Sequence, residues 1–164
     1  MYYADEFGLF RSVFDDDPGD VPAPYGGIGE LRRFDAAAGW IASIVNLLRV
    51  ALALNGDPNP PQILSLDMRD YAVAFPGQPF LSAPWYGAGR WVDGIGGWYS
   101  TGELPGSLAL LWMQPDGTII AAAMNKQLPG NDGDLLFQDF LIGTVNAVGA
   151  VTEWPTEGLF DRFN

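Results

Sequence analysis

The fold is decided by residues 97–125, GWYSTGELPGSLALLWMQPDGTIIAAAMN. Two groups of turn residues, Pro105-Gly106 and Pro115-Asp116-Gly117, divide this stretch into apolar and aromatic segments. The segments cover 97–102, 107–113 and 118–125. Segments of this length and composition, bounded by turn residues, predict β-strands that pair as hairpins. The stretch therefore predicts an antiparallel meander.

Apolar residues inside the meander indicate how its strands are buried. Leu110-Leu111 and Ile119-Ile120 interrupt the alternation of a half-exposed strand, and such runs predict central strands that are buried on both faces. A further aromatic segment, 86–92, precedes the meander and predicts one more short strand before the turn at Gly94-Ile95-Gly96.

Helical patterns flank these strands. Ser43 suits a helix cap, and apolar residues follow it at helical spacing until Gly56. A second helix is predicted from Ser65 to about Ala74, and a third over 135–148. We therefore predict an α/β (α+β) fold in which helices flank a small antiparallel meander sheet.

The chain length of 164 residues suits a single domain, 1–164. We expect it to contain, in order, an irregular N-terminal segment, a helical segment, the antiparallel strands, and a C-terminal helix with a tail. These parts cover 1–38, 39–84, 85–126 and 127–164.

The residue inventory excludes the common covalent hydrolase mechanisms for this chain. It contains no His and no Cys, so a Ser-His-Asp triad, a catalytic thiolate and disulfides are impossible. Lys126 is the only lysine, and the residue three positions before it is Ala123, so no Ser-x-x-Lys pair exists. A Tyr-x-Asn pair is also absent.

Charge and hydropathy limit the class of partner. Twenty acidic and eight basic residues give a formal net charge of −12, which repels phosphate backbones and anionic lipid surfaces. We expect neither a nucleic-acid partner nor a membrane partner. The first residues, MYYADEFGLF, lack the basic start and the apolar run of a signal peptide, so a soluble protein is expected. The compartment stays unknown, with the cytoplasm slightly favoured.

Five short sequence words occur in order along the chain. They are Ala38-Gly39-Trp40-Ile41-Ala42-Ser43, Leu47-Leu48-Arg49, Leu64-Ser65, Trp85-Tyr86-Gly87-Ala88-Gly89 and Trp98-Tyr99-Ser100-Thr101-Gly102-Glu103-Leu104-Pro105-Gly106. Together they resemble the C-terminal portion of the serine β-lactamase-related superfamily, which includes class C β-lactamases, D-alanyl-D-alanine carboxypeptidases and β-lactamase-type esterases. The resemblance implies hydrolase ancestry and a sheet related to the C-terminal part of the β-lactamase fold.

The resemblance also implies roles for a short run of β-strand residues. The family's Lys-Thr-Gly or His-Thr-Gly triplet corresponds to Ser100-Thr101-Gly102, so the basic residue is replaced by serine. The backbone N–H of Glu103 corresponds to an oxyanion-hole donor. Gly102 has two readings, close approach of a substrate to the backbone or a simple strand bulge. Substrate-binding candidates are Ser100, Thr101, Gly102, Glu103, Trp98 and Tyr86.

The family keeps its Ser-x-x-Lys nucleophile and Tyr-x-Asn base in an N-terminal portion that this sequence does not match. The first hypothesis is therefore a partial, non-catalytic β-lactamase-like module that is completed by self-association or by a partner chain. The second is a serine-type carboxylic-ester hydrolase with a separate N-terminal half, or with an atypical site whose catalytic candidates are Ser100, Tyr99 and Glu103.

A third hypothesis is binding without chemistry. Aromatic side chains near strand ends are able to stack on sugar rings, although burial in the core is the commoner fate of such residues. The aromatic residues in question are Trp85, Tyr86, Trp91, Trp98 and Tyr99. Candidate ligands are thus a small ester, an amide or a carbohydrate.

No cofactor and no metal site is predicted. The acidic run Asp15-Asp16-Asp17 with Asp20 lacks the spacing and the distal Glu of a calcium loop, so a solvated acidic loop is the preferred interpretation.

Overall fold

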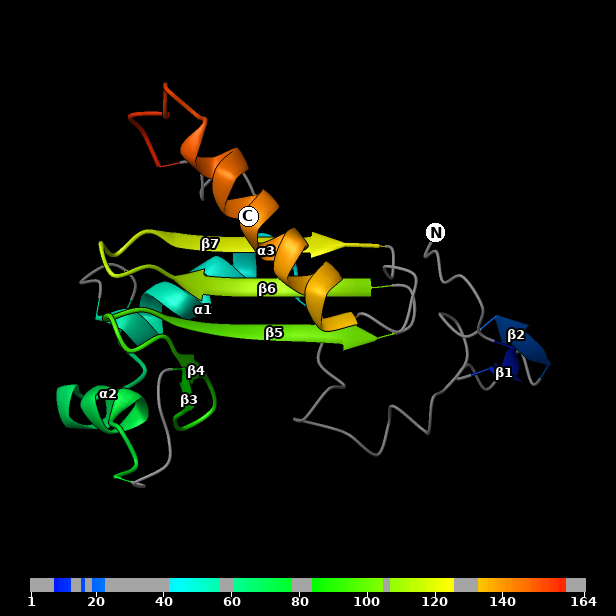
Figure 1. Ribbon diagram of the computed structural model, residues 1–164, viewed down its shortest axis with the longest axis horizontal. Helices are drawn as coiled ribbons and strands as arrows, with labels where there is room; N and C mark the ends of the chain where they lie inside the picture. Colours follow the sequence, from blue (N-terminus) through cyan, green and yellow to red (C-terminus); the bar gives the residue numbers. More distant parts are fainter. Residues whose placement is uncertain are drawn as a thin grey trace. The chain divides into compact units, whose positions relative to one another are not determined.

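The computed structural model describes residues 8–12, 16, 19–22, 42–56, 61–77, 84–104, 107–125 and 133–158. Its strands are β1 (Leu9–Arg11), β2 (Asp20–Pro22), β3 (Trp85–Tyr86), β4 (Trp91–Val92), β5 (Trp98–Leu104), β6 (Ser107–Met113) and β7 (Ile119–Met124). Its helices are α1 (Ile44–Asn55), α2 (Leu66–Val73) and α3 (Gly133–Gly149). Figure 1 shows these elements along the chain.

The chain divides into two compact units, and the division falls within β5, β6, β7 and α3. The first unit comprises 1–42, 102–109 and 123–144. The second comprises 43–101, 110–122 and 145–164. In the first unit β1 and β2 form a two-stranded antiparallel sheet, with Phe10 opposite Val21. The second unit contains α1, α2, β3 and β4 complete, and it carries the candidate sites.

The main sheet has five strands in the order β3-β4-β5-β6-β7 (Figure 1). Consecutive strands are neighbours throughout, as in a meander, so the predicted α+β fold with a small antiparallel sheet is confirmed. The segment 86–92, predicted as one strand, contains a tight hairpin instead. Gly87 N–H donates to the carbonyl of Arg90 at 2.8 Å, and Gly89 adopts a φ of +84° that favours glycine.

The turn between β6 and β7 follows the predicted Pro115-Asp116-Gly117 pattern. Thr118 N–H donates to Asp116 Oδ1 at 2.8 Å, and Gly117 has a φ of +88°. The prediction that Ile119-Ile120 lies in a central strand is wrong for the described sheet, because β7 stands at the end of the strand order. Ile120 is buried, whereas Ile119 and its neighbour Ala121 are half-buried, so β7 is not enclosed on both faces.

Both complete helices of the second unit begin at the predicted caps. Ser43 Oγ accepts a hydrogen bond from Asn46 N–H at 3.2 Å, and Ser65 Oγ accepts one from Met68 N–H at 3.3 Å. Gly56, with a φ of +95°, ends α1 in the left-handed conformation. The predicted C-terminal helix is α3. Among the residues described, no helix has the length and apolar character needed to cross a membrane.

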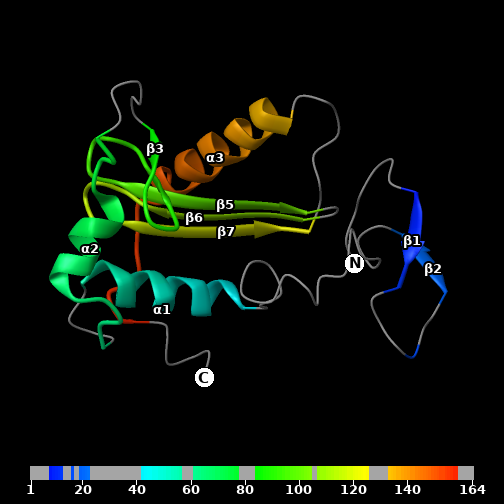
Figure 2. The same ribbon diagram turned by 90° about the horizontal axis from the view of Figure 1, so that it is seen from below.

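The core of the second unit lies between α1 and the strands. Figure 2 shows α1 running along one face of the sheet. The buried apolar residues are Ala51, Ala53, Ala72, Val92, Trp98, Leu110 and Ile120. Leu110 is 1% exposed and is the bulkiest side chain that is fully enclosed among the described residues. Small alanines on α1 allow the helix to approach the larger strand residues closely.

Candidate functional site

The register of β3, β4 and β5 separates the aromatic residues onto two faces. Tyr86 lies opposite Trp91, which lies opposite Tyr99. Trp85 lies opposite Val92, which lies opposite Trp98. Because successive strand residues point to opposite faces, the two rows belong to different sides of the sheet.

The first of these sets, Tyr86, Trp91 and Tyr99, is called the aromatic row here. The Tyr86 and Trp91 rings meet edge to face with centroids 5.2 Å apart. The Trp91 and Tyr99 rings are stacked, 15° from parallel, with centroids 6.4 Å apart. Tyr86 is 57% exposed and Trp91 is 39% exposed, so this face is open to solvent. The preferred reading of these aromatics as core residues is therefore wrong for Tyr86 and Trp91.

Trp98 belongs to the opposite, buried face and is 3% exposed. The substrate-binding candidates Trp98 and Tyr86 thus lie on different sides of the sheet. Ser100 is half-buried, and Thr101 is exposed. Gly102 and Glu103 belong to the first unit and are exposed, and a Cβ added at Gly102 would meet nothing within 4 Å.

Tyr99 keeps its proton more firmly than an ordinary tyrosine. Burial raises the pKa of its phenol, and the negative charge of Asp93 raises that pKa further. A phenol that stays protonated is a poor general base near neutral pH, and its O–H group is available to donate a hydrogen bond. Above about pH 10 a tyrosine in the unfolded chain loses its proton, whereas the half-buried Tyr99 of the folded chain keeps it. The free energy of unfolding therefore falls as the pH rises above this value.

Ser100 lacks the partner that a nucleophile requires. A catalytic hydroxyl is activated by a base within hydrogen-bond distance. Within the described part of the chain, the Ser100 side chain has no hydrogen-bond partner, and neither histidine nor cysteine exists to supply one. Among the described residues, no nucleophile–base pair is therefore assembled around Ser100.

Asp93 organises the loop between β4 and β5. Its Oδ1 accepts hydrogen bonds from Ile95 N–H at 2.9 Å and from Gly97 N–H at 2.8 Å. This is the Asx-turn geometry that aspartate favours, and Gly96, with a φ of +111°, completes the loop. This role was not predicted from the sequence, although aspartate followed by Gly94 is a recognisable turn signal.

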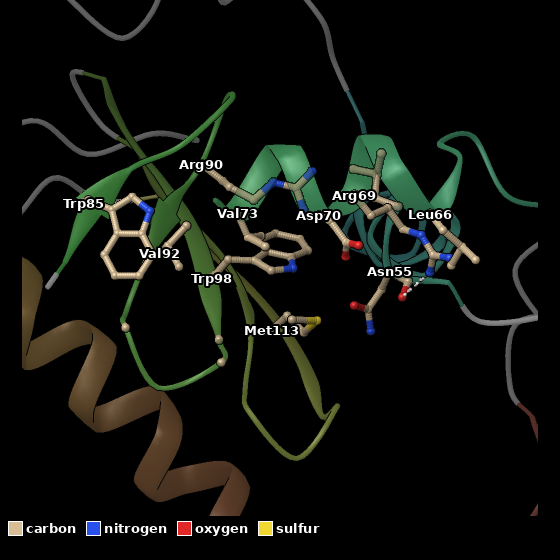
Figure 3. Close-up of a pocket in the computed structure, with 14 residues that line it drawn as sticks. Asn55, Leu66, Arg69, Asp70, Val73, Trp85, Arg90, Val92, Trp98 and Met113 are labelled. Atoms are coloured by element: carbon tan, nitrogen blue, oxygen red, sulfur yellow. Dashed lines mark hydrogen bonds between the residues drawn. The ribbon is translucent and has the colours of Figure 1, made fainter. Parts of the chain in front are cut away.

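A cavity of about 390 Å³ lies within the second unit (Figure 3). Its walls come from α1, α2, the β3–β4 hairpin, the Asp93 loop, β5 and β6. The lining residues are Leu54, Asn55, Leu66, Arg69, Asp70, Val73, Trp85, Arg90, Val92, Gly94, Gly96, Gly97, Trp98 and Met113. Arg69 and Arg90 were not predicted as site residues, since the elements that bring them to one cavity are separated in the sequence.

The described part of the chain contains no cluster of metal-ligating side chains. Among the described residues, no group of three or more acidic side chains is placed to hold a metal ion. Asp15 and Asp17, considered above for a cation, lie outside the described residues. No family model, no curated protein and no solved structure matches this chain.

Proposed function

We propose that this chain is a non-catalytic binding module of β-lactamase-like ancestry whose aromatic row receives a carbohydrate. The observation that carries the proposal is the open face of the row, where Trp91 lies between two tyrosines and remains 39% exposed. Sugar rings present flat C–H faces that pack well on aromatic rings, and the rigid rings lose little entropy on binding.

Polar groups beside the rings supply the hydrogen bonds that a sugar requires. The Tyr99 phenol is protonated at physiological pH, as tyrosines ordinarily are, and its pKa is shifted further upward, so its O–H group is available as a donor. Thr101, two residues further along β5, is exposed on the same face. No described residue forms a hydrogen bond with the Ser100 hydroxyl, which supports binding over hydrolysis.

Replacing Trp91 with alanine is expected to weaken oligosaccharide binding about tenfold or more, because both the contact area and the ring geometry are lost. Isothermal titration with the hexasaccharides of cellulose, xylan, chitin and starch measures this, with tryptophan fluorescence as a second signal. The matched control is Trp154→Ala, since Trp154 is 60% exposed and lies outside every strand. An absence of saturable binding by the unmodified protein would refute the carbohydrate assignment.

Self-association is a second candidate, favoured by the composition of β7. This strand, IIAAAM, stands at the end of the described sheet and contains no charged residue and no proline. Edge strands without such residues pair readily with another strand, and antiparallel pairing of two identical edges closes a two-fold dimer.

Ala123→Lys places a charge at an exposed position of β7. It is expected to convert such a dimer into a monomer of 17.7 kDa, because a lysine on an edge strand opposes pairing with another strand. Light scattering after gel filtration distinguishes the two masses. Ala88→Lys introduces the same charge at an exposed position in the β3–β4 turn and should leave the dimer intact. A folded monomer at all concentrations of the unmodified protein would count against self-association.

A further inference from the structure

Arg90 is a buried cation that has no carboxylate partner among the described residues. Its side chain is 8% exposed and is the buried charged residue of the described core. Its guanidinium carbon lies 4.3 Å from the centre of the Trp98 ring, an arrangement in which the ring face attracts the cation. Within the described part of the chain, no acidic side chain forms an ion pair with it. Burial lowers the pKa of this arginine, as expected for a charge that loses solvation without gaining an opposite charge.

Arg69 contributes a second guanidinium from α2. Its Nη1 donates to the carbonyl of Asn55 at 3.0 Å, which ties the end of α1 to α2. Its Nε is buried and has no hydrogen-bond partner. An N–H group that is withdrawn from water and left without an acceptor is costly, so the Arg69 side chain is held beside the cavity with its hydrogen-bonding needs incompletely met among the described residues.

These two cations line the same cavity with a single carboxylate. Figure 3 shows Arg90 and Trp98 on the sheet side and Asp70 beside Arg69 on the helix side. Among the residues that line the cavity, two arginines and one aspartate leave an excess of one positive charge. Such a local excess contrasts with the whole chain, whose formal net charge is −12.

We propose that this cavity binds a small organic carboxylate, with the Arg90 guanidinium as its principal anchor. The planar guanidinium offers paired N–H donors whose spacing matches the two oxygens of a carboxylate. The apolar body of the ligand packs against Trp98, Val73 and Met113, which line the cavity. The volume falls in the range of sites for small molecules.

The charge in the cavity favours a carboxylate over a phosphate. A carboxylate carries a single negative charge, which matches the local excess of about +1. A phosphate approaches two negative charges at neutral pH and would be repelled by Asp70, which lines the same cavity. The ligand is therefore a monoanion with an apolar or aromatic body.

Phenylacetate and its neutral isostere phenylacetamide provide the test. Phenylacetate should bind the unmodified protein saturably in isothermal titration and raise its melting temperature, whereas phenylacetamide should do neither. Arg90→Gln should weaken phenylacetate binding by about tenfold to a hundredfold, because hydrogen bonds between charged groups are lost. Arg49→Gln removes an α1 arginine outside the cavity and should bind phenylacetate like the unmodified protein.

The proposal fails if phenylacetate and phenylacetamide bind equally, if neither binds, or if Arg90→Gln binds like the unmodified protein. Inorganic phosphate that binds more tightly than phenylacetate would overturn the assignment to carboxylates. If Arg90→Gln does not fold, Arg90→Lys takes its place in the test. This variant should bind phenylacetate more weakly, because lysine keeps the charge but lacks the paired N–H donors of arginine. Trp91→Ala should still bind phenylacetate, because Trp91 does not line the cavity. The carbohydrate proposal and the carboxylate proposal are therefore able to fail independently.

Discussion

Leu110→Ala is expected to lower the free energy of unfolding by about 3–5 kcal/mol, the range for truncating a buried leucine where the surrounding residues cannot collapse. Leu110 is 1% exposed and comes from β6, between β5 and β7. Rigid strand neighbours on both sides limit relaxation into the space left behind. Since small domains are stable by about 5–15 kcal/mol, this change removes much of the total.

Urea denaturation followed by circular dichroism measures the effect. The midpoint should fall while the slope of the transition stays unchanged, because the surface exposed on unfolding is nearly the same. The matched control is Leu111→Ala, since Leu111 is next in the strand but only half-buried. The free energy of unfolding of Leu111→Ala should fall by less than half as much as that of Leu110→Ala. Equal losses for the two variants would contradict the assignment of the buried face.

Gly87→Ala is expected to cost about 2–3 kcal/mol by separating α2 from the β3–β4 hairpin. A Cβ at position 87 would collide with the carbonyl oxygen of Ala72, near the end of α2. The same carbonyl accepts a hydrogen bond from Ala88 N–H at 3.1 Å. Because backbone atoms cannot rotate away as a side chain can, the helix end must move and this hydrogen bond is strained.

The Gly87→Ala variant also tests how the cavity is built. Since α2 and the hairpin supply Asp70 and Arg90 to opposite walls, their separation should abolish phenylacetate binding even where the protein remains folded. Gly102→Ala is the control, because the added methyl group meets nothing within 4 Å. Its stability should change by less than about 1 kcal/mol, with a gain expected from the reduced entropy of the unfolded chain. A similar loss in both variants would refute the steric argument.

Local signals in the sequence were sufficient for the ends of α1 and α2. Ser43, Ser65 and Gly56 mark the helix ends because capping depends on hydrogen bonds and φ angles within a few residues. The turn at Pro115-Asp116-Gly117 was predictable for the same reason. Antiparallel pairing was predictable because the connections between the strands are short, and strands joined by short turns pair with each other.

Burial and the composition of the sites depended on contacts between distant segments. The segment 86–92 looked like one strand because its aromatic residues outweighed Gly87 and Gly89, which the structure uses for a turn. No local signal in the sequence indicates that Arg90 is buried or that it lines a cavity together with residues of α2. The division of Tyr86 and Trp98 between opposite faces required the register, which single-strand patterns do not fix.

The alternation along β5 limits how this protein is able to change in evolution. Tyr99 contributes to the open row while its neighbour Trp98 lines the cavity on the other face. A substitution at Tyr99 changes the aromatic row without changing the cavity wall, and a substitution at Trp98 does the reverse. An insertion or deletion of one residue in this strand would exchange the two faces, turning the indole to solvent and the phenol inward. Descendants of this chain should therefore vary in the identity of these residues but keep the length of the strand.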